Sequence, residues 1–142
     1  MQTLAIVNGD IALRSGSYAT VTGVTKLRQD LAYALREPMG IDRFHPRWGS
    51  LLSEAIGDAI NVRTTASISM EATRVIETYA RVQQDKIRRD ATNGKPSRFR
   101  AGEVIKSIDG VQVKQDQDTL HVRCAITTLS GDEVVLVTTV RV

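Results

Sequence analysis

Residues 119–128 read TLHVRCAITT and residues 133–142 read EVVLVTTVRV, and these two stretches decide the fold. In the first stretch every second residue is apolar, namely Leu120, Val122, Cys124 and Ile126. A period of two is typical of a strand with one buried face. Ser130-Gly131-Asp132 favours a turn between the stretches, and the second stretch is β-branched or apolar almost throughout. We therefore predict an antiparallel hairpin.

The region just before this hairpin also has strand character. Apolar residues recur there at Val104, Ile105, Ile108, Val111 and Val113. Asp109-Gly110 interrupts them, and an Asp-Gly pair between apolar runs favours a turn. We predict a strand with a turn at this pair, so that residues 103–142 form a C-terminal β-sheet.

Three helices are predicted between residues 24 and 91. The first begins near Thr25 and ends before Pro38, because the residue that precedes a proline is disfavoured in the helical conformation. Its apolar face consists of Leu27, Leu31, Ala34 and Leu35. A short second helix follows Ser50, whose hydroxyl is a candidate cap. Its apolar residues are Leu51, Leu52, Ala55, Ile56, Ala59 and Ile60. The third helix is long, from Thr64 to Arg89, and contains no proline or glycine.

The N-terminal residues indicate short extended pieces. Asn8-Gly9 lies between two apolar runs and predicts a hairpin, whereas Ser15-Gly16-Ser17 marks a loop. No internal repeat is evident. Because strands and helices are segregated along the chain, the fold class is α+β. We divide the single domain into an extended segment (1–23), a helical platform (24–91), a basic loop (92–102) and a sheet (103–142).

Composition excludes several classes of protein. The 142 residues are 42% hydrophobic, which is too apolar for a disordered chain. Cys124 is the only cysteine, so no disulfide framework is possible, and its place in an alternating strand favours a core residue over a nucleophile. No apolar run reaches the roughly 18 residues of a membrane span and no signal peptide is evident, so we expect a soluble protein that is intracellular when made. Neither metal-ligand spacing nor a phosphate-binding glycine loop is present, so no cofactor or metal is expected.

Positive charge is concentrated in one region. Between Arg81 and Arg100 seven residues are basic and two are acidic, while the whole chain has a net charge of +3. Such a patch fits nucleic acid, a solvated helix end or an acidic protein. Because aromatic residues make up only 4% of the chain, stacking on nucleic-acid bases is disfavoured. We expect a patch that faces protein.

Two further features are candidate interaction sites. The loop that contains Arg47 and Trp48 is rich in residues typical of interface hot spots, although the Trp48 ring could equally cover a junction between helices, with Gly49 permitting a close approach. Residues 133–142 suit a sheet edge that accepts another strand, or a central strand covered by the long helix. A glycosidase pair of Glu37 with Glu54 or Glu103 can be assembled, but acidic residues are easily paired on paper, and we expect no enzyme.

The order of several motifs resembles a known family. KLRQDL at 26–31 leads into PRWGSLL at 46–52, a long helix follows, and the chain closes with ITTLSGD at 126–132 and an apolar strand. From residue 24 onward this pattern is similar to the baseplate wedge family of contractile phage tails, also known as baseplate assembly protein W or lysozyme-like wedge proteins.

The resemblance implies a structural role in the virion tail baseplate, after synthesis in the host cytoplasm. Members of this family occur in sixfold wedges, bind the larger baseplate wedge proteins, contact tail tube or hub proteins, and template the tail sheath by exchanging β-strands. Nucleic acid and membrane are not among these partners. The strand-exchange role would fall on the terminal hairpin, residues 121–128 and 133–142. The predicted interface residues of its last strand are Glu133, Val135, Val137, Thr139 and Arg141.

The family also carries a Glu-Pro-Arg signature before the sheet, where it contacts the core bundle of the wedge. Only Glu103 of that signature is present here. We therefore add Glu103, with Arg47 and Trp48, to the predicted partner interface. Some relatives are labelled lysozymes, so a tail-tip peptidoglycan hydrolase is the alternative function. A regulatory adaptor of the same fold that binds a response regulator is a third hypothesis.

Overall fold

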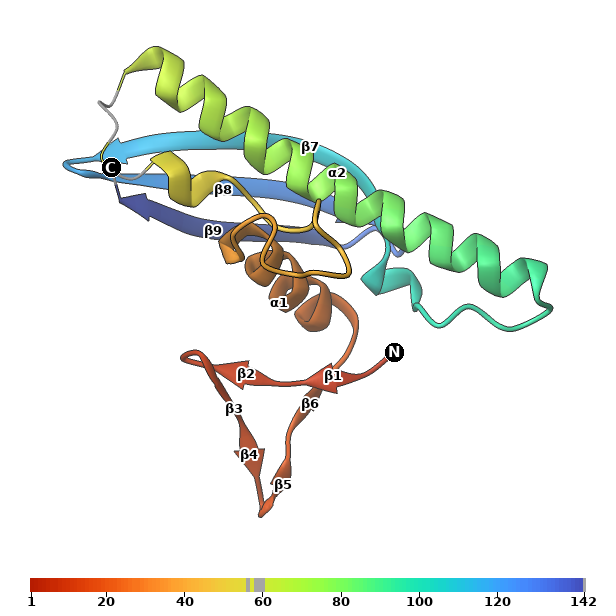
Figure 1. Ribbon diagram of the computed structural model, residues 1–142. Helices are drawn as coiled ribbons and strands as arrows, with labels where there is room; N and C mark the ends of the chain where they lie inside the picture. Colours follow the sequence, from red (N-terminus) through yellow and green to blue (C-terminus); the bar gives the residue numbers. More distant parts are fainter. Residues whose placement is uncertain (56, 58–60, 142) are drawn as a thin grey trace.

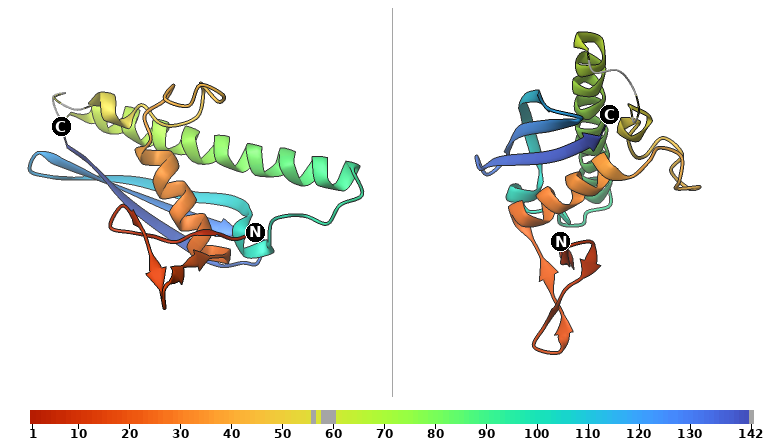
Figure 2. Two further views of the ribbon diagram at one scale, coloured as in Figure 1. Left: turned by 60° about the horizontal axis from the view of Figure 1, so that its bottom comes forward. Right: turned by 90° about the vertical axis from the view of Figure 1, so that its left-hand side faces the viewer.

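The computed structural model describes residues 1–55, 57 and 61–141. Its largest element is a three-stranded antiparallel sheet in the order β7 (Ile105–Asp116), β8 (Thr119–Thr128), β9 (Glu133–Arg141). Helices α1 (Gly23–Arg36) and α2 (Val62–Thr92) cover one face, with α2 over β7 and α1 over β9 (Figures 1 and 2). The predicted α+β class and the C-terminal hairpin are confirmed.

The core lies between this face of the sheet and the two helices. All four alternating residues of β8 are fully buried: Leu120, Val122, Cys124 and Ile126. Burial raises the pKa of the Cys124 thiol to about 11, as expected of a core residue rather than a nucleophile. The helices contribute the residues of their apolar stripes, among them Leu27, Leu31, Ala72 and Ile76.

The predicted turn at Asp109-Gly110 is wrong, because β7 continues through it. Ile108 pairs with Ile126 and Gly110 pairs with Ala125, which leaves Asp109 as an extra residue in a β-bulge. The Asp109 carboxylate accepts hydrogen bonds from the hydroxyls of Ser107 (2.9 Å) and Thr127 (2.6 Å). These two hydrogen bonds stabilise the bulge, so the backbone does not form the turn that an Asp-Gly pair favours. The chain reverses further on, at Gln117, whose φ is 53°.

Two of the three predicted helices are confirmed. Helix α1 ends at Arg36 just before Pro38, as predicted, and α2 begins after Asn61, whose side chain accepts a hydrogen bond from the Thr64 N–H. The described residues of the predicted middle helix form only a 3-10 turn, η1 (Leu52–Ala55). Ile56, Ala59 and Ile60 lie outside the described residues. The Ser50 hydroxyl accepts a hydrogen bond from the Leu52 N–H at 3.1 Å, at the start of this turn rather than of the predicted helix.

The N-terminal residues form an element that we call the N-terminal triangle, residues 3–21 (Figure 1). It consists of three two-residue ladders: β1 (Thr3–Leu4) with β6 (Thr20–Val21), β2 (Ile6–Val7) with β3 (Asp10–Ile11), and β4 (Leu13–Arg14) with β5 (Ser17–Tyr18). At its centre the Ala5 N–H donates to the Ala19 carbonyl, Ala12 to Ala5, and Ala19 to Ala12, at 2.8–2.9 Å.

The triangle reveals a repeat that the sequence analysis did not identify. Residues 5–11 read AIVNGDI and residues 12–18 read ALRSGSY, so alanine, an apolar residue, a Gly turn and a second apolar residue recur every seven positions. Asn8-Gly9 forms the predicted hairpin turn. Ser15-Gly16 forms a second one, because all four of these residues have positive φ. The expectation of no internal repeat was therefore wrong.

Gly49 fixes the loop after α1. Its φ is 97°, and a Cβ atom built there would lie 2.6 Å from the Glu37 carbonyl oxygen and 2.9 Å from the Pro38 backbone. The same backbone stretch is held by the Ser50 N–H, which donates to the Glu37 carbonyl at 2.7 Å, and the Met39 N–H, which donates to the Ser50 carbonyl at 3.0 Å. The close approach predicted for Gly49 is therefore confirmed.

Gly49→Ala is expected to lower the free energy of unfolding by about 3 kcal/mol, because it combines an unfavourable φ with a clash against backbone. Urea denaturation of both proteins measures the difference. Gly110→Ala is the matched control: its Cβ would meet nothing within 4 Å, and a change within about 0.5 kcal/mol is expected. Equal stabilities of the two variants would contradict this account of the loop.

Candidate interaction edge

Strand β9 lies at an edge of the sheet and pairs only with β8 within the described chain. Of the two positions predicted for the last strand, at a sheet edge or in the centre of the sheet, the structure therefore shows the edge. Its side chains alternate: Val134, Leu136, Thr138 and Val140 are buried against the helices. The predicted interface residues Glu133, Val135, Val137, Thr139 and Arg141 all project from the opposite face. Val137 is 60% exposed, so the outward face carries two valines among polar residues and is not buried within the chain.

The outward face of β9 continues across β8 and β7. Val135 is paired with Ala125, which is paired in turn with Gly110, and these small side chains make the centre of that face shallow. Both helices pack on the other side of the sheet (Figure 2, right). A second layer of protein could approach the backbone closely here.

The two edges of the sheet differ in regularity. The register between β8 and β9 runs without a shift from Thr119 paired with Arg141 to Thr127 paired with Glu133. The β7–β8 register shifts twice, next to Lys106 and at Asp109. Bulges bend and twist a strand and so hinder the addition of another one. β9 therefore presents the better template for a further strand.

Arg47 and Trp48 lie on the helical side of the sheet, away from the outward face of β9. The Trp48 indole N–H donates to the Glu37 carboxylate at 3.0 Å, and its ring centroid lies 5.9 Å from that of Tyr79 on α2. Trp48 thus covers the junction between the two helices, as one of its two predicted roles required. Arg47 is exposed next to it.

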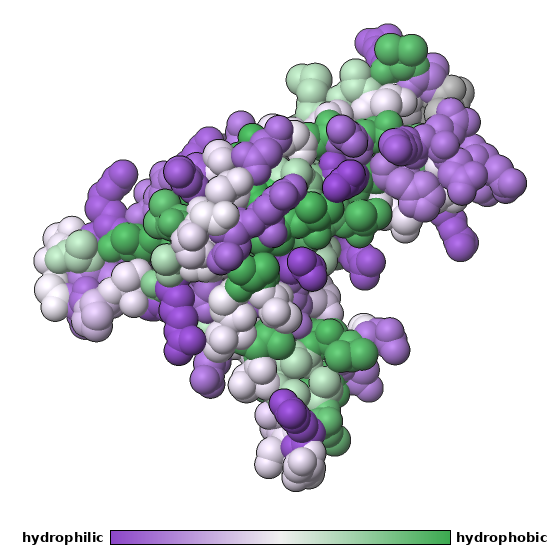
Figure 3. Space-filling model, turned by 180° about the vertical axis from the view of Figure 1, so that it is seen from behind, coloured by the Kyte–Doolittle hydropathy of each residue, from purple (hydrophilic) through white to green (hydrophobic). Residues whose placement is uncertain are grey.

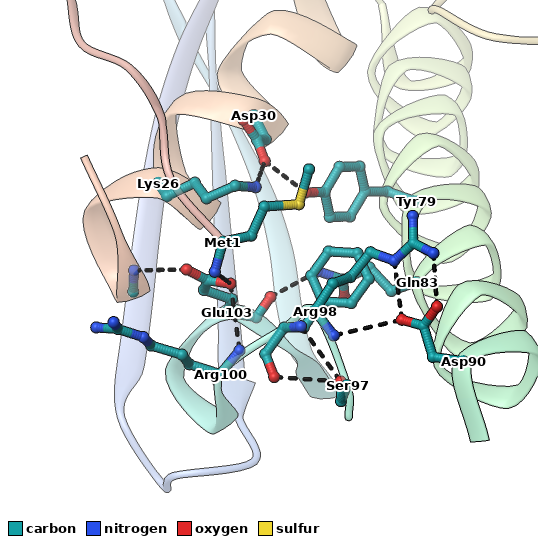
Figure 4. A network of polar contacts seen from close by, with 12 residues as sticks. Met1, Lys26, Asp30, Tyr79, Gln83, Asp90, Ser97, Arg98, Arg100 and Glu103 are labelled. Carbon is teal, nitrogen blue, oxygen red and sulfur yellow. Dashed lines mark hydrogen bonds and ion pairs between the residues drawn. The ribbon is translucent and has the colours of Figure 1, made fainter. Parts of the chain in front are cut away.

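Glu103 lies in the interior, 1% exposed, at the end of the short turn η2 (Ala101–Glu103) (Figure 4). Its carboxylate accepts hydrogen bonds from the N–H groups of Gly23 (3.0 Å) and Arg100 (3.2 Å) and lies 3.4 Å from the Met1 amine. It therefore ties the start of α1 to the start of the sheet. Contact between Glu103 and a partner stays a prediction.

Sequence reasoning missed the polar groups that fix α2 to the sheet and to α1. The Gln83 amide donates to the Glu103 carbonyl at 2.6 Å and its oxygen accepts from the Ile105 N–H at 3.2 Å. The buried Tyr79 hydroxyl donates to Asp30 at 2.7 Å, and Asp30 is also paired with Lys26. Burial and the charge of Asp30 raise the pKa of Tyr79. Gln83 lies four residues after Tyr79 and therefore on the apolar face of α2, and this spacing is the sequence pattern that could have identified it.

Glu37 and Glu103 do not form the close pair that a glycosidase needs. Glu37 and Glu103 lie at opposite ends of α1, about 20 Å apart at 1.5 Å per residue, whereas paired catalytic carboxyl groups lie about 5–10 Å apart. Among the described residues, four carboxyl groups have a clearly shifted pKa, and hydrogen bonds from His45, Arg74, Arg98 or backbone N–H groups lower it in each: Asp42, Glu71, Asp90 and Glu103. A general acid requires the opposite shift.

Among the described residues, no cluster of three or more His, Cys, Asp or Glu side chains could hold a metal ion. No described helix combines the length and the apolar character that a membrane span requires.

A comparison with family models found no match, and no curated protein matches either. Among solved structures, the chain is similar to a crystal structure of a protein from Geobacter sulfurreducens described as a "putative tail lysozyme". The TM-score is 0.58 with 12% sequence identity, over 82% of this chain and 88% of that chain. At this identity the likeness shows a shared fold.

Glu103→Gln is expected to lower the free energy of unfolding at pH 7 by about 2 kcal/mol, because a buried charged acceptor is lost. Burial raises the pKa of Glu103, but the N–H donors outweigh it and the pKa lies below the usual 4.5. Its stabilisation is therefore present above about pH 4.5 and disappears as the pH falls through the lowered value.

Urea unfolding of wild type and variant at pH 7 and pH 3 measures both effects, and the variant should lose less stability on acidification than the wild type. Glu77→Gln, at an exposed position on α2, is the control and should match the wild type at both pH values. A Glu103→Gln variant as stable as the wild type at pH 7 would contradict the assigned role.

Proposed function

We propose that this protein is a non-enzymatic structural component of a contractile phage tail baseplate. It joins larger baseplate wedge proteins to the tail sheath and templates the sheath by β-strand exchange at β9, in multiple copies around the tail tube. The observation that carries the proposal is the open and regular edge of β9, with Val135 and Val137 on its outward face, opposite a β7 edge that carries bulges. The similarity to a protein described as a "putative tail lysozyme" fits a setting in a phage tail.

The extent of exposed surface supports an assembly component. The protein exposes 9234 Å². A folded monomer of 15.6 kDa exposes about 7,200 Å². The difference of about 2,000 Å² corresponds to between two and three standard interfaces at roughly 800 Å² per partner. Part of it lies on the N-terminal triangle, which projects from the body with exposed apolar side chains (Figure 3): Leu4, Val7, Ile11, Leu13 and Tyr18.

The peptidoglycan hydrolase alternative has less support. The separation of Glu37 from Glu103 is too large for glycoside hydrolysis, and the shifted carboxyl groups have lowered pKa values. In the proposed function the protein acts through main-chain hydrogen bonds. Such bonds connect identical subunits repeatedly and tolerate changes in side chains.

Val135→Lys with Val137→Lys is expected to reduce the number of sheathed tails at least tenfold, because lysines along an edge strand oppose the addition of another strand. Tails from cells that carry the variant gene are counted by negative-stain electron microscopy. Substitution is preferable to deletion of β9, since Val134, Leu136 and Val140 belong to the core.

Gln112→Lys with Gln115→Lys places the same charges on the β7 edge and is the matched control, with normal sheathed tails expected. Thermal unfolding of both double variants within a few degrees of the wild type shows that the fold is intact. Normal sheath assembly by the β9 variant, or equal loss in both variants, would refute strand exchange at β9.

A further inference from the structure

A groove of about 470 Å³ lies between the N-terminal triangle, α1, the loop before Gly49 and α2. It is separate from the outward face of β9 and is lined mainly by apolar and aromatic groups. Four of the six aromatic residues in the whole chain line it: Tyr33, Trp48, Tyr79 and Phe99. We call it the aromatic groove.

This concentration exceeds what the fold requires. Tyr79 belongs to the core, but Tyr33 is 41% exposed and both Trp48 and Phe99 are only partly buried. Partly exposed aromatic rings around a concavity are typical of protein interface hot spots, where they fill pockets against a partner.

The charges at the groove favour an acidic partner. Lys26 and Asp30 in its floor neutralise each other, and Lys26 also lies 6.0 Å from the centre of the Phe99 ring. Lys86 stands exposed at the rim. Arg89 lies three residues further along α2 and therefore on the same side of the helix.

The acidic residues near this rim are already paired. Asp90 accepts from Arg98 Nε at 2.8 Å and Nη2 at 2.5 Å, and this ion pair lowers the pKa of Asp90 to about 2. Asp42, which also lines the groove, accepts from Phe44 N–H and lies 2.8 Å from His45 Nδ1. Lys86 and Arg89 are therefore the cations that an incoming segment meets on this side of α2.

We propose that the aromatic groove is a second docking surface, which binds an acidic amphipathic segment of a partner protein. Apolar side chains of that segment enter among the aromatic rings, and its carboxylates face Lys86 and Arg89. This surface would hold the protein from its helical side while β9 is engaged on the other, so it extends the proposed function and does not depend on it.

Trp48 is the only tryptophan of the chain and reports on the groove directly. The probe is a 16-residue synthetic helix without tryptophan, with leucines on one face and glutamates on both flanks. We expect it to shift Trp48 emission with a micromolar Kd. A peptide with lysines in place of the glutamates should bind at least tenfold more weakly.

Lys86→Glu with Arg89→Glu should weaken binding of the acidic peptide at least tenfold. Lys114→Glu with Arg123→Glu makes the same change of charge on the outward face of the sheet, and should leave the Kd within twofold. Circular dichroism confirms that both variants are folded. The Val135→Lys and Val137→Lys variant should bind the peptide normally, so failure here and failure of strand exchange are distinguishable.

The proposal is wrong if Trp48 emission does not respond to the acidic peptide, or if the acidic and basic peptides bind equally. It is also wrong if the two charge-reversed variants bind alike. Tighter binding of a 20-base-pair DNA duplex than of the acidic peptide, lost in the Lys86 and Arg89 variant, would assign the rim to nucleic acid and overturn the proposal.

Discussion

The packing of two helices against one face of β8 is the constraint on which the rest of the structure depends. Leu120, Val122, Cys124 and Ile126 are fully buried, and α1 and α2 together supply enough apolar surface to cover this one face. A three-stranded sheet has a second face and two edges. Because the described helices cover only one face, the outward face and the β9 edge remain open. These are the parts of the sheet that we assign to partners.

Buried polar groups keep this open edge in a fixed place. Glu103 ties the start of α1 to the start of β7, Gln83 ties α2 to the same backbone, and Tyr79 joins α2 to Asp30 on α1 (Figure 4). Every buried side-chain nitrogen and oxygen in the described part of the chain has a hydrogen-bond partner. Satisfied polar networks of this kind specify one arrangement of helices and sheet. A rigid platform is what a template for a repeating assembly requires.

Much of the fold could be predicted, because periodicity reports burial directly. The alternation in β8, the stripe of α2 and the stop at Pro38 each reflect one local rule. The errors arose where tertiary contacts override a local signal: Asp109-Gly110 favours a turn, but the hydroxyls of Ser107 and Thr127 stabilise a bulge instead. The repeat in the N-terminal triangle was not predicted, because its three alanines contribute backbone hydrogen bonds, which leave little trace in composition. Gln83 and the aromatic groove depend on residues brought together from distant parts of the chain.

Amide hydrogen exchange tests the central claim most directly. The protein is compared alone and with the tail sheath protein, and exchange is followed separately in β7 and β9. If β9 is completed by a strand of the sheath protein, the amides of residues 133–141 that face away from β8 become protected, because they gain main-chain partners, while those of β7 exchange as before. Unchanged exchange in β9, or protection confined to β7, would contradict the account.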